Sequence, residues 1–585
     1  MRYHILAADY DGTFAHDGRV DEATIASLRR LRETGRKLVL VTGRELDQLL
    51  EVLPEIDLFD RVVAENGALL YRPEGREELP LAEPPPPEFV ARLRGRGVGP
   101  ISVGRVIVAT WEPHEAAVLE TIRELGLELQ VIFNKGAVMV LPSGVNKASG
   151  LGHALAELGL SPHNAVGVGD AENDHAFLAV CECAAAVSNA LATIKERADW
   201  VSRRDHGAGV VQLIEALEVD DLAGVEPRLT RHHVLLGTRD DGREVRIPPY
   251  GRSVLVAGTS GSGKSTLTAG LLERLAEAGY QFVIIDPEGD YADFELAVGL
   301  GDRQHAPSPD GALDLLARSG FPSVSVNLLG IPLADRPRSS DGLLPRLQEL
   351  RARTGRPHWI VVDEAHHLLP SAWDPAASVV PGELGAMLSI TVHPGSISHA
   401  VLESIDLLLA VGESPERTVR EFCEASGRDI PDGLGPTTLE SGEALAWTVN
   451  GAEPPFRVAT VPPRGERRRH GRKYVEGNLG PDRSFYFRGP AGALNLRAQN
   501  LLIFLQVADG VDDPTWLFHL RRGDYTRWFR EQVKDDGLAA VADRIAAESG
   551  LSAAEGRARI RQAIEGRYTL PAEPSDSATD PTKFG

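Results

Sequence analysis

Apolar runs alternate with amphipathic, helix-favouring segments along residues 1–217 of the chain. Short apolar runs bounded by glycine and polar residues are typical of buried strands, and the longer segments between them are typical of helices. This alternation predicts an α/β domain with a parallel sheet. The strands that we expect are Tyr3–Ala8, Lys37–Val41, Arg61–Ala64 and Ala165–Val168.

A proline-rich stretch at residues 80–87 interrupts this alternation. Such a stretch predicts a loop that leads into an inserted subdomain. We therefore place the α/β core at residues 1–70 and 143–217 and an α+β insert at residues 71–142. Within the insert, strands near 106–109 and 137–141 are expected around a helix at Glu115–Leu125.

A second alternation predicts another α/β domain at residues 228–463. Its expected strands are Ser253–Ala257, Gln281–Ile285, Ser323–Leu328, Trp359–Val362 and Leu407–Val411. Residues 464–483 carry a dense basic stretch that predicts a solvated linker, with contact to an anionic partner as the alternative. Residues 484–568 predict a small, mainly helical module, and the tail at 569–585 is rich in proline, serine and aspartate, which predicts disorder.

Composition narrows the class of protein. The 585 residues are 42% hydrophobic and 25% charged, which is typical of a globular protein of several domains. The net charge of −22 argues against indiscriminate coating of nucleic acid, although it leaves room for a local basic channel. No apolar run is long enough to span a bilayer, no leader is evident, and the three cysteines suit buried free thiols. These features predict a cytoplasmic protein without a membrane partner.

The first set of chemical motifs begins at Asp9-Tyr10-Asp11-Gly12-Thr13, directly after the first apolar run. A carboxylate that attacks a phosphoryl group needs a metal to offset charge repulsion, a proton donor for the leaving oxygen, and donors around the phosphoryl group. Asp9 and Asp11 suit the nucleophile and the proton shuttle. Thr42 offers a hydroxyl at a second strand end, Lys147 offers a positive charge, and residues 169–174 (GDAEND) offer acidic ligands that favour Mg²⁺.

These four motifs, in this order, resemble those of haloacid dehalogenase-like phosphatases with a cap inserted between the second and third motifs. The resemblance covers about residues 1–217 and implies a Rossmann-like core with the insert as the cap. It implies that Asp9 forms an aspartyl-phosphate and that Asp11, which dehalogenase members lack, is the general acid and base. It further implies phosphate binding by Thr42, Lys147 and Asn173, and Mg²⁺ binding by Asp9, Asp11, Asp170 and Asp174. The substrate is expected to be a phosphorylated small molecule, whose identity depends on the cap.

The second set of motifs is the glycine-rich loop at residues 258–265 (GTSGSGKS), between an apolar strand and a helix-favouring run. Such a loop presents backbone N–H groups to a triphosphate, with a lysine for the β and γ phosphates and a hydroxyl for Mg²⁺. The expected ATP-binding residues are Gly258, Gly261, Gly263, Lys264, Ser265 and Thr266. Downstream, Asp363 suits coordination of Mg²⁺ together with Ser265, and Glu364 suits polarisation of the attacking water.

Residues 233–461 resemble hexameric motor ATPases of the HerA/FtsK type, through the segments 284–291 (IIDPEGDY) and 363–366 (DEAH). The resemblance implies a homo-oligomeric ring, a hexamer in the family. Members often carry a polar sensor at the end of a later strand, commonly glutamine. Here Thr391 or His393 is the candidate, and Arg417 and Arg420 are candidates for an arginine that acts across subunits.

Residues 485–529 are dense in aromatic and arginine side chains. Such interleaving can stack on bases or bind phosphate, but a compact helical module explains the same residues and is the favoured interpretation.

Three hypotheses for the whole chain follow. In the leading one, a Mg²⁺-dependent phosphatase is joined to an ATP-binding and hydrolysing domain that regulates it or forms a ring motor. In the second, the ATPase is a nucleic-acid motor and the phosphatase processes ends or nucleotides, as in a defence system. In the third, the weakest, the chain is a kinase–phosphatase that repairs polynucleotide ends.

Overall fold

The computed structural model describes residues 1–567, apart from 260, 293, 303, 319, 321, 333–334, 372–385, 465–478, 480–482, 534 and 549. Most of the expected linker at 464–483 and the expected disordered tail at 569–585 lie outside the described residues. The chain forms two compact units, Met1–Pro463 and Arg464–Gly585. Among the described residues, no helix combines the length and the apolar character that crossing a bilayer requires.

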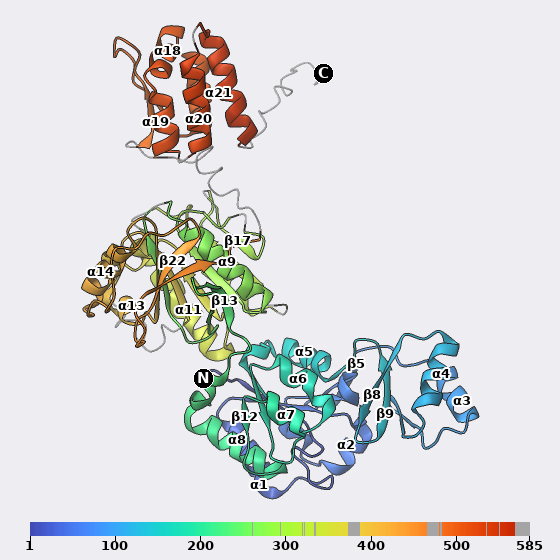
Figure 1. Ribbon diagram of the computed structural model, residues 1–585. Helices are drawn as coiled ribbons and strands as arrows, with labels where there is room; N and C mark the ends of the chain where they lie inside the picture. The colour runs from blue at the N-terminus through green and yellow to red at the C-terminus, as the bar shows by residue number, and fades with distance from the viewer. Residues whose placement is uncertain are drawn as a thin grey trace, which may run out of the picture. The chain divides into compact units, whose positions relative to one another are not determined.

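An eight-stranded sheet forms the core of the first α/β domain (Figure 1). Six adjacent strands run parallel, and two antiparallel strands complete one edge. The order across the sheet is β12 (Trp200–Val201), β11 (Cys183–Ala186), β10 (Ala165–Gly169), β1 (Ile5–Ala8), β2 (Lys37–Val41), β3 (Arg61–Ala64), β4 (Leu69–Arg72) and β5 (Glu77–Pro80). The helices are α1 (Glu22–Glu33), α2 (Leu46–Val52), α5 (Lys147–Leu158), α6 (His175–Val180), α7 (Ala192–Arg197) and α8 (His206–Asp220).

The inserted cap is a four-stranded antiparallel sheet with two helices. Its strands, in spatial order, are β6 (Ser102–Val103), β7 (Val108–Trp111), β9 (Ala137–Pro142) and β8 (Leu129–Asn134), and its helices are α3 (Pro87–Gly95) and α4 (Glu115–Leu125). In Figure 1 the two helices cover the face of β8 and β9 that is turned away from the core. The other face packs on the core through Met139, Leu141 and Ala68.

The start of the insert differs from the expected residue 71. Residues 69–80 form the hairpin β4–β5, which pairs with β3 and so extends the core sheet. Leu69 and Leu70 are fully buried, and this burial fixes β4 in the core. The cap elements therefore begin after the proline-rich loop, at α3.

An eleven-stranded mixed sheet organises residues 234–460. Alternate residues of its central strands enter two separate hydrophobic clusters: Leu255 and Ala257 on one side, Val254 and Val256 on the other. Both faces of the sheet are thus buried, which explains why these strands are apolar without interruption. The order is β14 (Glu244–Ile247), β13 (Val234–Thr238), β23 (Phe456–Thr460), β22 (Glu443–Thr448), β21 (Leu407–Val411), β15 (Val254–Gly258), β20 (Met387–Thr391), β19 (Trp359–Val362), β16 (Phe282–Asp286), β18 (Ser323–Asn327) and β17 (Ala297–Leu300).

The helices of this domain follow the parallel strands, as in other α/β folds. They are α9 (Lys264–Glu277), α10 (Pro309–Ala317), α11 (Arg336–Thr354), α12 (Ala365–Leu368), α13 (His399–Glu403) and α14 (Pro415–Ser426). Together with the first domain and its cap, this architecture confirms the predicted fold class.

The second unit is a small helical module with a two-stranded hairpin. Its elements are β24 (Phe485–Phe487), β25 (Leu496–Ala498), α17 (Leu501–Gly510), α18 (Asp513–Arg521), α19 (Asp524–Glu531), α20 (Asp536–Ala547) and α21 (Ala553–Arg567). Trp516, Tyr525 and Phe529 are buried in its core. These aromatic rings hold the module together, so they are not available to stack on bases.

Candidate active sites

The first candidate site lies where three neighbouring parallel strands end. Asp9 follows β1, Thr42 follows β2 and Asp170 follows β10. Ala8 at the end of β1 pairs with Val168 of β10 and with Leu40 of β2, so the three polar residues lie along one edge of the sheet. Motifs that are far apart in the sequence are therefore close together in the fold.

A buried lysine joins two of the carboxylates. Lys147 Nζ lies 2.6 Å from Asp9 Oδ1 and 2.6 Å from Asp174 Oδ1, and its side chain is 1% exposed. Lys147 is held at the first turn of α5 because Asn146 caps that helix through a reciprocal pair of hydrogen bonds. Asp174 Oδ2 in turn accepts the backbone N–H of Asp170. The network fixes the side chains from three separate motifs in one place.

Three carboxylates crowd together at this edge of the sheet. Burial and the nearby Asp174 raise the pKa of Asp9, and Lys147 opposes this effect. Burial also raises the pKa of Asp170, against a hydrogen bond from Lys135. Carboxylate oxygens of Asp9, Asp170 and Asp174 lie within 4.8 Å of one another. An all-oxygen donor set of this charge fits Mg²⁺.

Asp11 stands apart from this cluster. Its carboxylate accepts two hydrogen bonds of 2.6 Å from Arg44, one from Nε and one from Nη2, and its side chain is 40% exposed. The backbone carbonyl of Asp11, in contrast, faces the cluster, since it accepts a hydrogen bond from Lys135 Nζ at 3.2 Å. The side chain of Asp11 thus pairs with Arg44 and is not part of the cluster.

Thr42 and Asn173 flank the cluster. Thr42 is fully buried and its hydroxyl oxygen accepts the backbone N–H of Arg44 at 3.1 Å. Asn173 Nδ2 donates to Asn66 Oδ1 at 3.0 Å. Gly12 leaves room between the strand ends, because a Cβ atom there would come within 2.4 Å of Asp170 Oδ2.

Three residues in or near the site were not predicted. Arg44 fixes Asp11, and Lys135 at the tip of the β8–β9 hairpin reaches from the cap to Asp170 Oδ2 at 2.9 Å. Glu65, fully buried after β3, accepts the backbone N–H groups of Arg105, Val106 and Ile107, and so fastens the cap to the core. The Lys-Gly pair between two apolar runs was a turn signal for Lys135.

The second candidate site is the loop between β15 and α9. Gly261 and Gly263 adopt positive φ angles of 80° and 94°, which let the loop curl around its own N–H groups. A Cβ atom on Gly258 would come within 2.1 Å of the Val411 carbonyl oxygen, so glycine is required there. Lys264 Nζ donates to the carbonyl oxygens of Gly258 and Thr259 at 2.9 and 3.0 Å. Ser265 and Thr266 follow Lys264 in the first turn of α9.

The acidic partners of this loop follow β19, which is separated from β15 by β20 alone. Asp363 is buried, and Glu364 adopts a left-handed backbone conformation with φ of 43°. His366 Nδ1 lies 3.5 Å from a Glu364 carboxylate oxygen and 3.2 Å from Thr391 Oγ1. Burial, His367 and His393 lower the pKa of His366 to about 4, which keeps the ring neutral. His366 thereby links Thr391 to Glu364.

The candidate arginines for action across subunits lie on α14. Arg417 is 80% exposed and its Nε lies 3.1 Å from Glu421 Oε1. Arg420 is exposed and its Nη2 is 3.5 Å from the Leu434 carbonyl oxygen. Their role across subunits stays a prediction.

Comparisons with known proteins find relatives of the first domain and a family match in the second. The sequence profile of haloacid dehalogenase-like hydrolases matches residues 6–90 and 106–214, and that of the central domain of the helicase HerA matches residues 245–326. The phosphoglycolate phosphatase of Halorubrum lacusprofundi is 32% identical over 219 residues, which are 35% of this chain and 95% of that protein. That of Methanoculleus marisnigri is 28% identical over 227 residues, 36% of this chain and 94% of that protein. A haloacid dehalogenase-like hydrolase structure from Bacteroides thetaiotaomicron is 18% identical, with a TM-score of 0.33 over 37% of this chain and 99% of that one.

The chain belongs to the haloacid dehalogenase-like hydrolases through its first 214 residues. It is a phosphatase of this class that also carries a HerA-type domain.

Proposed function

We propose that residues 1–217 form a Mg²⁺-dependent phosphomonoesterase in which Asp9 accepts the phosphoryl group. The observation that carries the proposal is the position of Asp9, at the end of the central strand β1 and 2.6 Å from the buried Lys147. Asp9, Asp170 and Asp174 would hold the ion through their carboxylates and Asp11 through its backbone carbonyl. When bound, Mg²⁺ offsets the repulsion between the Asp9 carboxylate and the phosphate dianion.

In the first step, a carboxylate oxygen of Asp9 attacks phosphorus and the bond to the ester oxygen breaks. Asp11 donates its proton to the departing oxygen, which leaves as an alcohol. Lys147, Thr42 and Asn173 donate hydrogen bonds to the phosphoryl oxygens. The product of this step is an aspartyl-phosphate on Asp9.

In the second step, Asp11 removes a proton from a water molecule that attacks the aspartyl-phosphate. The P–O bond to Asp9 breaks, inorganic phosphate leaves, and Asp11 is protonated again. Arg44 supports both steps, because its two hydrogen bonds orient the Asp11 carboxylate.

The substrate that we propose is a small phosphorylated carboxylic acid such as phosphoglycolate. Relatives that this chain covers over 94–95% of their length are named phosphoglycolate phosphatases. Lys135 supports the same class, because its ammonium group extends from the cap into the site and is half exposed. Once Mg²⁺ neutralises Asp170, Lys135 is available to pair with a substrate carboxylate.

Steady-state turnover with Mg²⁺ tests this assignment. Phosphoglycolate, glucose 6-phosphate and p-nitrophenyl phosphate are compared by kcat/KM, and Asp9→Asn is the inactive control. The proposal expects phosphoglycolate to exceed glucose 6-phosphate by at least about tenfold. Equal kcat/KM values for phosphoglycolate and glucose 6-phosphate would contradict the proposed substrate class. Turnover by Asp9→Asn would contradict the assignment of Asp9 as the nucleophile.

For residues 228–463 we propose ATP binding and hydrolysis. Lys264 would hold the β and γ phosphates, Ser265 and Asp363 would hold Mg²⁺, and Glu364 would polarise water. The remaining loop residues, Gly258, Gly261, Gly263 and Thr266, would line the phosphate path. Loss of ATP binding in Lys264→Ala, with retained binding in Lys195→Ala of the phosphatase domain, would support this role.

The coupling that we propose is regulation of the phosphatase by the nucleotide state of the HerA-type domain. Buried polar contacts between the two domains support it: Arg356 Nη2 donates to the Gly159 carbonyl oxygen at 2.6 Å, and Tyr280 Oη donates to Glu182 at 2.9 Å. A non-hydrolysable ATP analogue should change phosphatase turnover in the wild type and leave it unchanged in Lys264→Ala.

The second candidate is a nucleic-acid motor, a hexameric ring whose phosphatase processes ends or nucleotides, as in a defence system. The match to the central domain of HerA supports it. ATP hydrolysis that rises with DNA and falls steeply with salt would favour the motor. The three cysteines are buried and free, which supports a reducing compartment such as the cytoplasm.

A further inference from the structure

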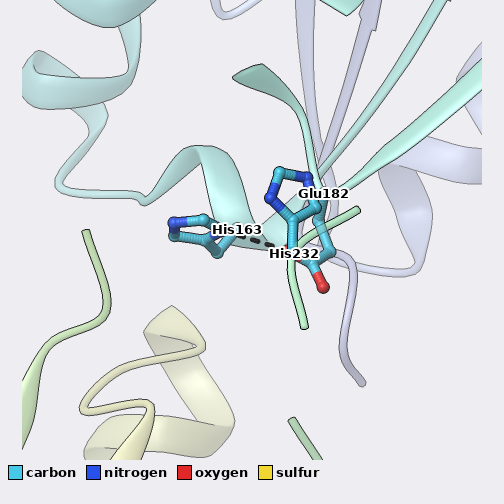
Figure 2. A group of neighbouring side chains, drawn as sticks. All are labelled: His163, Glu182 and His232. Atoms are coloured by element: carbon cyan, nitrogen blue, oxygen red, sulfur yellow. Dashed lines mark hydrogen bonds and ion pairs between the residues drawn. The ribbon is translucent and has the colours of Figure 1, made fainter. Parts of the chain in front are cut away.

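Not every buried polar group of the first unit takes part in the proposed reactions. At the junction of the phosphatase core with the HerA-type domain, His163, Glu182 and His232 lie together (Figure 2). Tyr280 Oη and Arg2 Nη2 donate to the two carboxylate oxygens of Glu182, and His163 Nδ1 lies 3.0 Å from one of them. These contacts join the two domains. A different group lies beside the phosphatase site, in the turn that follows β3.

This turn, η2 (Glu65–Gly67), has a left-handed backbone at three consecutive residues. The angle φ is 51° at Glu65, 54° at Asn66 and 105° at Gly67. Residues with a side chain adopt this conformation rarely, and it persists only where the surrounding structure holds it. The contacts of the turn therefore show what holds it and what it holds in return.

The backbone of the turn holds the loop that follows β2. The N–H of Glu65 donates to the carbonyl oxygen of Arg44, and the N–H of Asn66 donates to the carbonyl oxygen of Thr42, both at 2.9 Å. Two hydrogen bonds thus fix the loop that carries the Thr42 hydroxyl to the turn.

Gly67 sets the distance between the turn and helix α5. A Cβ atom on Gly67 would come within 1.9 Å of the carbonyl oxygen of Asn146, the residue before Lys147. A Cβ atom on Gly150, on the same helix, would come within 2.7 Å of Gly67 Cα. The turn and the first turns of α5 are therefore in direct backbone contact, and glycine is required on both sides.

The side chain of Asn66 reaches the loop after β10. Asn66 is 1% exposed, and its Oδ1 accepts a hydrogen bond from Asn173 Nδ2 at 3.0 Å. Among the described residues, Asn173 alone forms a hydrogen bond with the Asn66 side chain. The paired amides lie beside the loop after β2, because a Cβ atom on Gly43 would be 3.6 Å from Asn173 Nδ2 and 3.9 Å from Asn66 Oδ1.

This contact fixes the direction of the Asn173 amide. An amide nitrogen carries two N–H groups, which point in different directions. Because Asn66 Oδ1 takes one of them, the other has a fixed direction as well. Asn173 is only half buried, so without Asn66 its side chain could turn to other rotamers. A donor that is oriented before phosphate binds stabilises the charge on the phosphoryl oxygens better than one that has to turn first.

We propose that Asn66 is a positioning residue of the phosphatase, which holds the Asn173 amide ready to donate to a phosphoryl oxygen. The proposal rests on the proposed function, in which Asn173 binds phosphate. Asparagine suits this place because it tolerates a left-handed backbone and because its side chain supplies the accepting oxygen. The same turn holds the carbonyl groups of Thr42 and Arg44 and packs directly before Lys147. One turn thus keeps phosphate-binding residues of three motifs at a fixed spacing.

Binding of inorganic phosphate to the full-length protein in the presence of Mg²⁺, measured by isothermal titration calorimetry, tests the role of Asn66. Asn66→Gly removes the accepting oxygen and keeps the left-handed backbone, which glycine adopts without strain. It should weaken phosphate binding about five- to tenfold. Arg76→Gly is the matched control, because Arg76 is exposed and also has a left-handed backbone, with φ of 51°. This control should bind phosphate like the wild type.

A double-mutant cycle separates positioning from direct binding. Asn173→Ala should weaken phosphate binding at least as much as Asn66→Gly does. In the Asn173→Ala background, Asn66→Gly should cause no further loss, because no amide is left to hold. The same pattern is expected for kcat/KM with phosphoglycolate. A merely structural role of Asn66 would instead lower the Tm equally in both backgrounds and leave the phosphate Kd of the folded protein unchanged.

Unchanged phosphate affinity in Asn66→Gly would overturn the role of Asn66 and leave the proposed phosphatase intact. A further loss in the double variant would also overturn it, since Asn66 would then bind phosphate itself. Equal affinity in the wild type and Asn173→Ala would remove Asn173 from the phosphate site, and the role of Asn66 with it, while turnover that depends on Asp9 would retain the nucleophile. A wild type that binds no phosphate would contradict both the proposed phosphate site and the role of Asn66.

Discussion

Arg44 holds the carboxylate of Asp11 by two parallel hydrogen bonds of 2.6 Å each. A bidentate contact of this kind fixes both the position and the plane of a carboxylate. Because Asp11 is 40% exposed, few other contacts restrain it. The orientation of the proposed general acid therefore depends on one arginine.

The first prediction concerns that contact. Arg44→Ala should lower kcat for phosphoglycolate by about 10- to 100-fold, because a mobile Asp11 protonates the leaving alkoxide oxygen less often. KM should change less. Arg29→Ala, a change of an exposed arginine on α1, is the control and should keep kcat. Equal kcat values for wild type and Arg44→Ala would show that Asp11 needs no orientation by Arg44.

The second prediction concerns the crowded carboxylates. Mg²⁺ should raise the Tm of the wild type. At a Mg²⁺ concentration a hundredfold above Kd, the expected stabilisation is about 2.7 kcal/mol. Asp9→Asn and Asp170→Asn should each be more stable than the wild type without Mg²⁺, since burial raises the pKa of both carboxyl groups. Both variants should respond less to Mg²⁺. Differential scanning fluorimetry with and without EDTA measures this, and an equal Mg²⁺ response in all three proteins would contradict the site.

The third prediction concerns the lysine at the tip of the cap hairpin. Lys135→Ala should lower kcat/KM for phosphoglycolate by about tenfold or more and leave p-nitrophenyl phosphate, which has no carboxylate, within about twofold. Lys37→Ala is a matched control, because Lys37 is 47% exposed and Lys135 is 50% exposed. Equal losses for both substrates would mean that Lys135 acts on the phosphoryl group or on the fold.

The fourth prediction concerns pH and the buried His4. Burial and the charged N-terminus lower the pKa of His4 to about 4, from 6.5. The unfolded chain therefore binds a proton between pH 6.5 and 4 that the folded chain does not, and stability falls as the pH drops through this window. The shift corresponds to roughly 3 kcal/mol.

Urea unfolding at pH 7.5 and pH 5 measures the effect of His4. His4→Leu should reduce the difference in unfolding midpoint between the two pH values, because it removes the titrating group. His153→Leu, at an exposed position on α5, is the control and should leave the difference unchanged. An identical pH response in wild type and His4→Leu would assign the acid sensitivity to other groups.

The fifth prediction concerns the junction of the two domains. Tyr280→Phe removes the hydroxyl that donates to the buried Glu182 and should lower stability by about 1–3 kcal/mol. It should also weaken any effect of an ATP analogue on phosphatase turnover. An unchanged analogue effect in a destabilised Tyr280→Phe would show that the contact is structural only.

Local sequence patterns were sufficient to predict the bounds of several strands and of one helix. The strands Lys37–Val41, Arg61–Ala64, Trp359–Val362 and Leu407–Val411 and the helix Glu115–Leu125 have the predicted bounds. Each is an apolar or amphipathic run with clear polar ends. The same apolar runs place Asp9, Thr42 and Asp170 at the ends of strands. These ends are neighbours because the strands run parallel.

Other features could not be predicted, because they depend on partners far apart in the sequence. The hairpin β4–β5 joins the core sheet only through its pairing with β3. Glu65 accepts from residues some forty positions later, and His163 meets the Ala278 carbonyl across 115 positions. Neither glutamate nor histidine carries a local signal for such a contact. The junction therefore became visible only in the fold.

The residues of the junction lie at the amino ends of their strands. His163 and Glu182 precede β10 and β11, and Tyr280 precedes β16, whereas both phosphate sites lie at the carboxyl ends of their sheets. A strand of four or five residues is about 15 Å long. Each candidate site therefore lies about one strand length away from the junction. An effect of one site on the other that passes through the junction has to cross the length of these strands.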